Sequence, residues 1–229
     1  MRLRPGHRLL VLAGLCGAAA AAVAHPHGRL DCQVQIDAGP AGLRGIDLRL
    51  ALDAASSASL LPRLQLPEGG GPATTKDGRQ FAELVAGMFR QSGWMLKLQA
   101  LGADGEPTGT ALDLADPAPA LFSRTADGLV TVAVRLQPEA PAAAPHGWAL
   151  ACQDPSWYWA TGFAGAAQFS ATPGCKADLQ AMRDMAEQAK ALQAAAQRAG
   201  VPGADTAAPG LLQGSGVRAM AGTVRCPAP

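Results

Sequence analysis

The pattern of apolar and polar residues predicts a domain that is rich in β-strands. Apolar and polar side chains alternate partly from Arg29 to Ile36 and more regularly from Leu43 to Leu52, with a Gly/Pro turn between the two segments. Alternation with a period of two places every second side chain on the same face of a half-buried strand. We therefore expect a β-hairpin at the start of the mature domain.

Later segments with strand character continue this pattern along the chain. Alternation or clustered apolar and β-branched residues indicate further strands at Trp94–Leu101, Leu129–Leu136, Trp148–Cys152, Trp157–Phe163 and Val217–Cys226. A Pro/Ala spacer, Pro138–Pro145, separates two of them, and Gly and Pro residues predict loops at Pro67–Pro72 and Pro202–Gly216.

Two segments have the helical spacing of apolar residues. The first is Asp77–Gln91, which is followed by Gly93, a residue type that often ends helices. The second is Ala177–Ala199, whose Leu, Met and Ala residues form a stripe that would need a packing partner. The fold class predicted is therefore α+β: a strand-rich antiparallel sheet domain over residues 25–229, with one early helix and one long helix near the C-terminus.

The first 24 residues have the features of a secretory signal peptide. Arg2, Arg4 and Arg8 precede the apolar run Leu9–Ala22, and small residues at Ala22 and Ala24 predict cleavage after Ala24. The apolar run is shorter than the roughly 20 residues of a membrane-spanning helix, and Leu15 before Cys16 is too bulky for a lipoprotein cleavage site. The mature protein is expected in the periplasm, not spanning the membrane.

Charge and cysteine content narrow the classes of partner and chemistry. The 229-residue chain has a formal net charge of +1, and loss of the signal arginines makes the mature chain slightly acidic, which argues against nucleic acid as a partner. Cys16 leaves with the signal peptide, and the four remaining cysteines are Cys32, Cys152, Cys175 and Cys226. An even number in an oxidising compartment predicts two disulfides, and the spacing leaves three pairings open.

The predicted mature N-terminus, His25-Pro26-His27, is a candidate metal site. A terminal histidine offers its α-amine and an imidazole nitrogen together, and such nitrogen donors suit copper, nickel or zinc. Pro26 has no N–H, so binding through successive deprotonated amides is excluded, but an amine–imidazole or two-imidazole site is not. Asp31 and Asp154 are carboxylates that could complete the site.

Other residues with chemical potential have structural explanations. His146 follows the Pro/Ala spacer and fits a loop, and the dipeptide Asp154-Pro155 also fits the start of a turn. The sequence around Ser56, Ser57 and Ser59 lacks a nucleophile motif, and phosphate-binding and dinucleotide-binding motifs are absent from the chain. We therefore expect a protein that is not an enzyme. The aromatic residues Trp157, Tyr158, Trp159 and Phe163 are expected to pack in the core rather than line a ligand cleft.

Several short motifs occur in an order that resembles a known family. They are His25-Pro26-His27, Asp31 and the strand after it, the passage Phe89–Trp94, Asp154-Pro155, Pro173-Gly174-Cys175 and Val224-Arg225-Cys226. Together they resemble the secreted bacterial family called domain of unknown function 1007, labelled the periplasmic component of an uncharacterised ABC-type transport system.

The resemblance implies a role in periplasmic handling of nickel, cobalt or zinc beside an inner-membrane metal transporter, with His25, His27, Asp31 and Asp154 as ligands. It also implies that Cys175 pairs with Cys226, which leaves Cys32 with Cys152. Relatives carry an acidic calcium-type loop where this chain has Glu68–Gly78, and too few oxygen ligands remain here for calcium. A module that docks on a membrane transport assembly without a ligand of its own is the main alternative, and a binding protein for an organic solute is the third.

Overall fold

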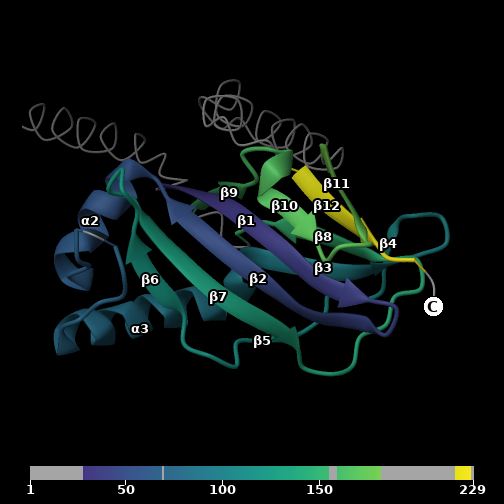
Figure 1. Cartoon of the computed structure of the whole chain (residues 1–229), viewed down its shortest axis with the longest axis horizontal. Coiled ribbons are helices and arrows are strands. Elements are labelled where there is room, and N and C mark those ends of the chain that lie inside the picture. The colour runs from purple at the N-terminus through teal and green to yellow at the C-terminus, as the bar shows by residue number, and fades with distance from the viewer. Residues whose placement is uncertain (1–27, 69, 155–158, 182–219, 228–229) are drawn as a thin grey trace, which may run out of the picture.

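The structure consists of two β-sheets with two α-helices packed at one end (Figure 1). It is a computed structural model that describes residues 28–68, 70–154, 159–181 and 220–227. The first sheet has seven strands: β1 (Gly28–Gly39), β2 (Gly42–Leu52), β5 (Leu114–Ala115), β6 (Leu121–Arg124), β7 (Val130–Pro138), β9 (Trp159–Gly162) and β10 (Phe169–Ala171). The second has five: β3 (Leu96–Leu101), β4 (Pro107–Thr108), β8 (Trp148–Cys152), β11 (Lys176–Ala181) and β12 (Met220–Arg225).

The predicted hairpin is confirmed as β1 and β2, which pair in antiparallel fashion from Leu30 with Leu52 to Gly39 with Gly42. Every second residue of β1 is buried, and the residues between them are exposed or half-buried. β2 pairs with β7 on its other side, so the alternation of all three strands buries one shared face. The opposite face carries the polar side chains of this sheet.

Parallel pairs extend the first sheet at the other edge of β1. β9 pairs with Gly28–Asp31, and β10 pairs with Val34–Ile36, both parallel to β1. The remaining strand pairs of both sheets are antiparallel among the residues described. The expectation of a wholly antiparallel sheet is therefore wrong at this edge.

The second sheet and the helices share one apolar core with the first sheet. All five residues of β8 are buried, which fits its place in the middle of the second sheet, between β12 and β3. α3 (Lys76–Gln91) directs Val85, Ala86 and Phe89 into the core. Leu50 and Leu150, both 0–1 % exposed, belong to the same cluster from opposite sheets.

The predicted helix arrangement, one early helix and one long helix near the C-terminus, is wrong. The early helix is confirmed as α3, but a second early helix, α2 (Ala54–Leu64), precedes it and was not predicted. Residues 177–181, where the long C-terminal helix was expected to begin, lie in β11 and pair with β12. The rest of that expected helix, the signal peptide and the linker at 202–216 lie outside the described residues.

The strand expected from Trp94 begins two residues later, at Leu96. Gly93, Trp94 and Met95 all have positive φ angles, of 63°, 58° and 60°, and form the short 3-10 turn η2 (Gly93–Met95). This left-handed turn ends α3 and directs the chain into β3. Trp94 is 2 % exposed, and its ring stacks on Phe89 with the ring centres 6.1 Å apart. In the described part of the chain, we find no helix with the length and apolarity needed to cross a membrane.

Ser57 joins α2 to the first sheet. Ser57 is buried, with 1 % of its surface exposed. Its hydroxyl donates to the Leu52 carbonyl and accepts from the Val130 N–H at 2.9 Å. The helix itself begins at Asp53, whose carboxylate accepts from the Ser56 N–H. A buried hydroxyl that connects β2, α2 and β7 fixes where this helix sits.

Ser57→Ala should destabilise the fold by about 1–3 kcal/mol, because the Val130 N–H loses its partner in a buried place. Ser59→Ala is the matched control, since Ser59 is exposed and its hydroxyl donates only to the Ser56 carbonyl. Urea unfolding of both variants measures the difference. Equal stabilities would show that Ser57 does not hold the helix to the sheet.

Candidate functional site

The start of β1 lies against an aromatic ring from β9. Gly28, the residue that follows His27 in the sequence, pairs with Trp159. A Cβ atom at Gly28 would lie 2.5 Å from Ser56 Oγ and 2.6 Å from Trp159 Cζ3, so a larger residue could enter only if these side chains moved. Glycine at this position therefore lets α2 and β9 approach the beginning of β1 closely.

Asp154 fixes the approach of β9 to β1. Asp154 is only 1 % exposed, and its Oδ2 accepts from the Trp159 N–H at 2.8 Å. The Asp154 N–H donates to Thr161 Oγ1 at 2.9 Å. The two hydrogen bonds thus join the end of β8 to β9, and the carboxylate lies one hydrogen bond from the partner of Gly28.

Asp31 lies on the other side of this strand from the disulfide residue Cys32. Its carboxylate pairs with Arg29 Nε at 2.8 Å, and about a third of the side chain is exposed. The structure therefore brings Asp31 and Asp154 to the same end of β1 but gives the two carboxylates different hydrogen-bond partners. Asp31 is paired with the Arg29 guanidinium, whereas the Asp154 carboxylate accepts from the backbone N–H of Trp159.

The two histidines of the predicted metal site, His25 and His27, lie outside the described residues. Within the described ranges, no three His, Cys, Asp or Glu side chains form a group that could hold a metal ion. His146 is exposed at the far end of β8 from Asp154, and this five-residue strand spans about 17 Å. A metal site that includes Asp154 would therefore need ligands from outside the described residues.

Two disulfides close the fold, Cys32–Cys152 and Cys175–Cys226. This is the pairing that the family resemblance implied. The first joins β1 to β8, so it links the two sheets across a sequence separation of 120 residues. Because Asp31 precedes Cys32 and Asp154 follows Cys152 by two residues, this disulfide also brings the two aspartates to the same end of the sheets.

A network of ion pairs covers the outer face of the first sheet, and the sequence analysis missed it. Asp37 receives Arg44 and Arg135, each at 2.6 Å, and Arg135 also pairs with Asp47 at 2.6 Å. Alternation predicts that these residues share one face of the sheet. Which of them form ion pairs depends on the register of β2 with β7, in which Asp47 lies opposite Arg135, and the sequence does not give that register. Asp53, by contrast, could have been found from its N-cap position after a strand.

The arginines lower the pKa of the Asp37 carboxyl. The hydrogen bond from Arg135 has the largest effect, burial opposes it, and the hydrogen bond and charge of Arg44 add to the lowering. A carboxyl with a lowered pKa in the folded state stabilises the fold above its unfolded pKa, and this stabilisation is lost as the pH falls through the folded pKa.

Asp37→Asn should therefore lower the stability at pH 7 by up to about 1 kcal/mol, since the ion pairs are partly exposed. The gap between variant and wild type should narrow as the pH falls below 3.8, the ordinary value for this carboxyl, because the wild type then loses its charge as well. Urea unfolding at a series of pH values measures this gap. The exposed turn variant Asp127→Asn serves as control, and a gap that stays constant down to about pH 2 would contradict the assignment.

Comparison with known proteins identifies a family without assigning an activity. No curated protein matches this chain. A family model described as "Protein of unknown function (DUF1007)" matches residues 10–211, which is well over half of the 229 residues. The chain therefore belongs to this family of proteins of unknown function, DUF1007.

Proposed function

We propose that this protein is a periplasmic accessory or binding protein for a transition metal, either nickel, cobalt, zinc or copper, and that it acts with an inner-membrane transporter. The observation that supports this most directly is the pairing of Gly28 with Trp159, whose N–H bonds to the buried carboxylate of Asp154. The residue before Gly28 is a histidine. An imidazole and a carboxylate thus belong to adjoining segments.

Covalent geometry limits how far the histidines can be from this carboxylate. Consecutive Cα atoms are about 3.8 Å apart, so the Cα of His27 lies one such step from Gly28 and that of His25 at most three steps. Imidazole nitrogens with one carboxylate form a mixed ligand set that suits zinc, nickel or copper.

Asp154 is the stronger carboxylate candidate of the two. It is 1 % exposed, and its Oδ2 accepts from the N–H of Trp159, the residue that pairs with Gly28, which directly follows the histidines in the sequence. The Asp31 carboxylate forms an ion pair with Arg29 at 2.8 Å, and the positive charge of that guanidinium would repel a metal ion. We therefore assign Asp154 as a ligand and treat Asp31 as a weak contributor. The proposal includes no catalysis.

Calorimetric titration of the processed protein with zinc, nickel, copper and cobalt salts tests this function. We expect one-to-one binding by the wild type, and loss of binding in His25→Ala/His27→Ala. Asp154→Asn should weaken the affinity by roughly tenfold or more, as loss of a ligand or of its orienting partner does. The amide oxygen of the asparagine can still accept from the Trp159 N–H, so the turn should stay intact.

Asp31→Asn is the matched control, with the same chemical change on a neighbouring carboxylate, and should alter the affinity little. Absence of binding by a correctly processed wild type, with His25 verified as its first residue by mass spectrometry, would exclude the metal function. Equal effects of the two aspartate variants would leave the histidines as ligands but remove Asp154 from the site.

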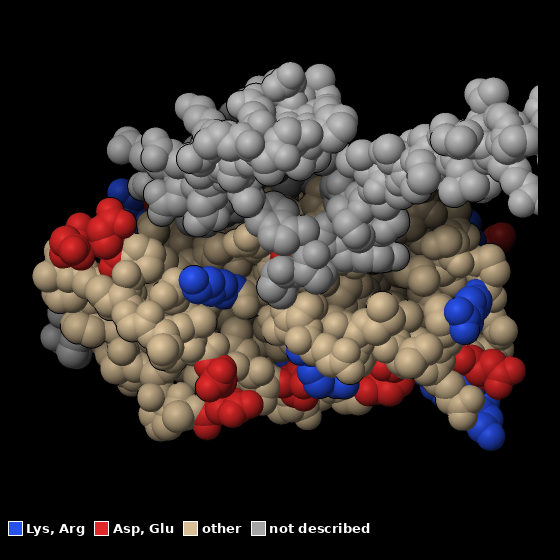
Figure 2. Space-filling view, turned by 180° about the vertical axis from the view of Figure 1, so that it is seen from behind, with Lys and Arg blue, Asp and Glu red and all other residues tan. Residues whose placement is uncertain are grey.

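A protein-interaction module is the second candidate, and the outer face of α3 favours it. Leu84 and Met88 are one helical turn apart and are 60 % and 62 % exposed, which is unusual for large apolar side chains at neighbouring positions. Gly87 lies between them, with open space where a Cβ would be. Figure 2 shows the face opposite to that of Figure 1, where uncharged side chains cover most of the visible middle and charged ones lie toward the lower edge and the ends.

Leu84→Lys/Met88→Lys distinguishes the two candidates. Both side chains are exposed, so the fold should keep its stability within about 0.5 kcal/mol per substitution. If α3 docks on a membrane transport assembly, the variant should lose capture of that assembly from detergent-solubilised membranes while its metal affinity stays unchanged. Unchanged capture would remove α3 as the docking face.

A further inference from the structure

The two disulfides differ in their access to solvent. Cys32 and Cys152 are 0 % and 6 % exposed and lie between the sheets. Cys175 and Cys226 are only partly buried and lie where β11 and β12 meet the rim of the domain. Disulfide exchange requires that a thiolate reach one of the two sulfur atoms, so the second disulfide is the reactive one.

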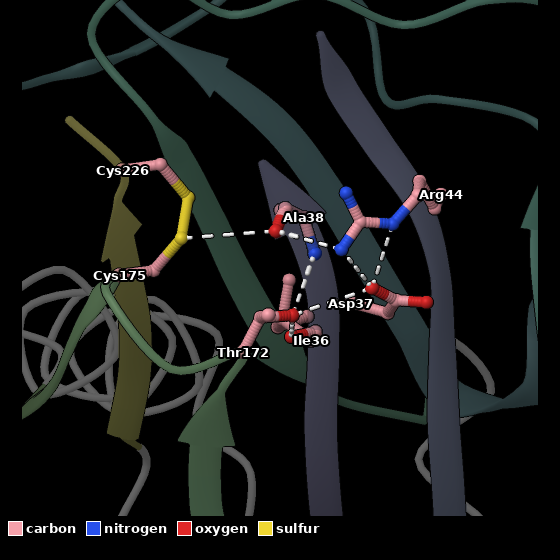
Figure 3. Close-up of a disulfide and its surroundings, with 7 residues drawn as sticks. All are labelled: Ile36, Asp37, Ala38, Arg44, Thr172, Cys175 and Cys226. Carbon is pink, nitrogen blue, oxygen red and sulfur yellow. Dashed lines mark hydrogen bonds and ion pairs between the residues drawn. A yellow bond between two sulfur atoms is a disulfide. The ribbon is translucent and has the colours of Figure 1, made fainter. Parts of the chain in front are cut away.

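The Cys175 side of this disulfide is held to β1 (Figure 3). Thr172 donates its N–H to the Ile36 carbonyl at 2.9 Å, and its hydroxyl accepts from the Ala38 N–H at 3.2 Å. The Cys175 N–H closes the turn back to Thr172, and Cys175 Sγ lies 3.8 Å from the Ala38 carbonyl oxygen. If the bond to Cys226 broke, Cys175 would therefore stay in place with an acceptor beside its sulfur.

The Cys226 side borders a small cavity. The cavity has a volume of about 210 Å³ and is lined by Cys226 but not by Cys175. Gly42 and Gly147 also line it, with φ angles of 116° and 106°, and a Cβ at either position would clash with the carbonyl oxygen of Ala142 or Val224. A small molecule that enters the cavity therefore borders Cys226 and not Cys175.

A basic residue adjoins each cysteine of this disulfide in the sequence. Lys176 and Arg225 form the last residue pair of β11 and β12, next to the two cysteines, and both are exposed. Neither has an acidic side chain within 4.0 Å in the part of the chain that the structure describes. The carboxylate of Asp37 is already paired with Arg44 and Arg135. Positive charge near a cysteine stabilises its thiolate and attracts anions.

We propose that Cys226 is a site of thiolation by small anionic thiols. The sulfur of the incoming thiolate bonds to Cys226 Sγ, the bond between Cys226 and Cys175 breaks, and its electron pair leaves on Cys175 Sγ. The Cys175 thiolate takes a proton from water and can then donate its S–H to the Ala38 carbonyl. A second thiolate attacks the outer sulfur of the mixed disulfide and frees Cys226 as a thiolate. In sum, two thiols are oxidised to one disulfide and the protein disulfide is reduced.

This exchange would free the end of β12 from the corner between β10 and β11. The disulfide Cys32–Cys152 would keep the two sheets joined, because it lies in the core away from the cavity. The proposal does not depend on metal binding.

A charge series of thiols tests the proposal on the full mature chain in its oxidised form. Mercaptoethanesulfonate is anionic, 2-mercaptoethanol neutral and cysteamine cationic, and each is used at the same thiolate concentration and quenched with acid at timed intervals. Peptide mapping by mass spectrometry should find the first adduct on Cys226. At low salt the anionic thiol should react roughly tenfold faster than the cationic one, and high salt should reduce this ratio.

Lys176→Gln/Arg225→Gln should remove most of the preference for the anionic thiol while the rate with the neutral thiol changes little. Lys97→Gln is the matched control, since Lys97 is an exposed lysine on β3 of the same sheet, and should leave the preference unchanged. First adducts on Cys175, or on Cys32 or Cys152 at a comparable rate, would overturn the proposal. So would a disulfide that reacts only after the protein is unfolded with denaturant.

Discussion

The pairing of β1 on both of its edges is the constraint on which the rest of the structure depends. β1 pairs with β2 along one edge and with β9 and β10 along the other, and it carries Cys32 to the disulfide with β8 of the second sheet. That disulfide closes a loop of about 120 residues. A cross-link of this span stabilises the folded state by about 5 kcal/mol in the chain-entropy model, because it restricts the unfolded chain. One strand therefore determines how both sheets and the turn at Asp154 are placed.

The alternation along β1, β2 and β7 places the apolar side chains that stabilise the fold on the inner face of the sheet and the charged side chains on the outer face. Leu30, Ile36 and Ile46 are 0 % exposed on the inner face, and burial of such side chains contributes roughly 1.5–3 kcal/mol each. The outer face has partly exposed ion pairs, which contribute far less in water. Polar side chains on that face therefore add little to stability, and the fold depends mainly on the shared core.

The sequence predicted elements where local signals and tertiary contacts agree. The hairpin and α3 have strong periodicity and β8 is a continuous apolar run, and the structure places all three close to the expected bounds. The long helix was wrong because Leu179 belongs to a stripe with helical spacing, whereas pairing with β12 beside the disulfide Cys175–Cys226 makes these residues a strand. Tertiary pairing outweighs propensity in such short segments. The Ala- and Ser-rich sequence of α2 has little apolar periodicity, and Asp53 was its one clear signal.

The residues of the candidate site could be named from the sequence, but their contacts and their burial could not. Asp31 and Asp154 were predicted as carboxylates that could complete the histidine site, but only the structure separates a partly exposed aspartate paired with an arginine from a buried one bonded to the start of β9. The hydrogen bonds of the two carboxylates are local, but the pairing that brings Trp159, the partner of Asp154, beside Gly28 joins β1 and β9, which are more than a hundred residues apart in sequence. No local pattern encodes such a parallel pairing.

The proposed metal site and the proposed thiol site lie at opposite ends of β1, and this separation determines how they can be related. Gly28 is beside the turn at Asp154, whereas Ala38 faces the disulfide Cys175–Cys226. Ten strand residues span about 33 Å, which is too far for a ligand at one end to contact the other. Any coupling would have to pass through β1 itself, whose pairing with β2 is continuous except for a register shift at Asp37 and Ala38. Because Cys32–Cys152 stays closed in the core, exchange at the rim disulfide would leave the Asp154 end of the strand unchanged, so the two activities are expected to be independent.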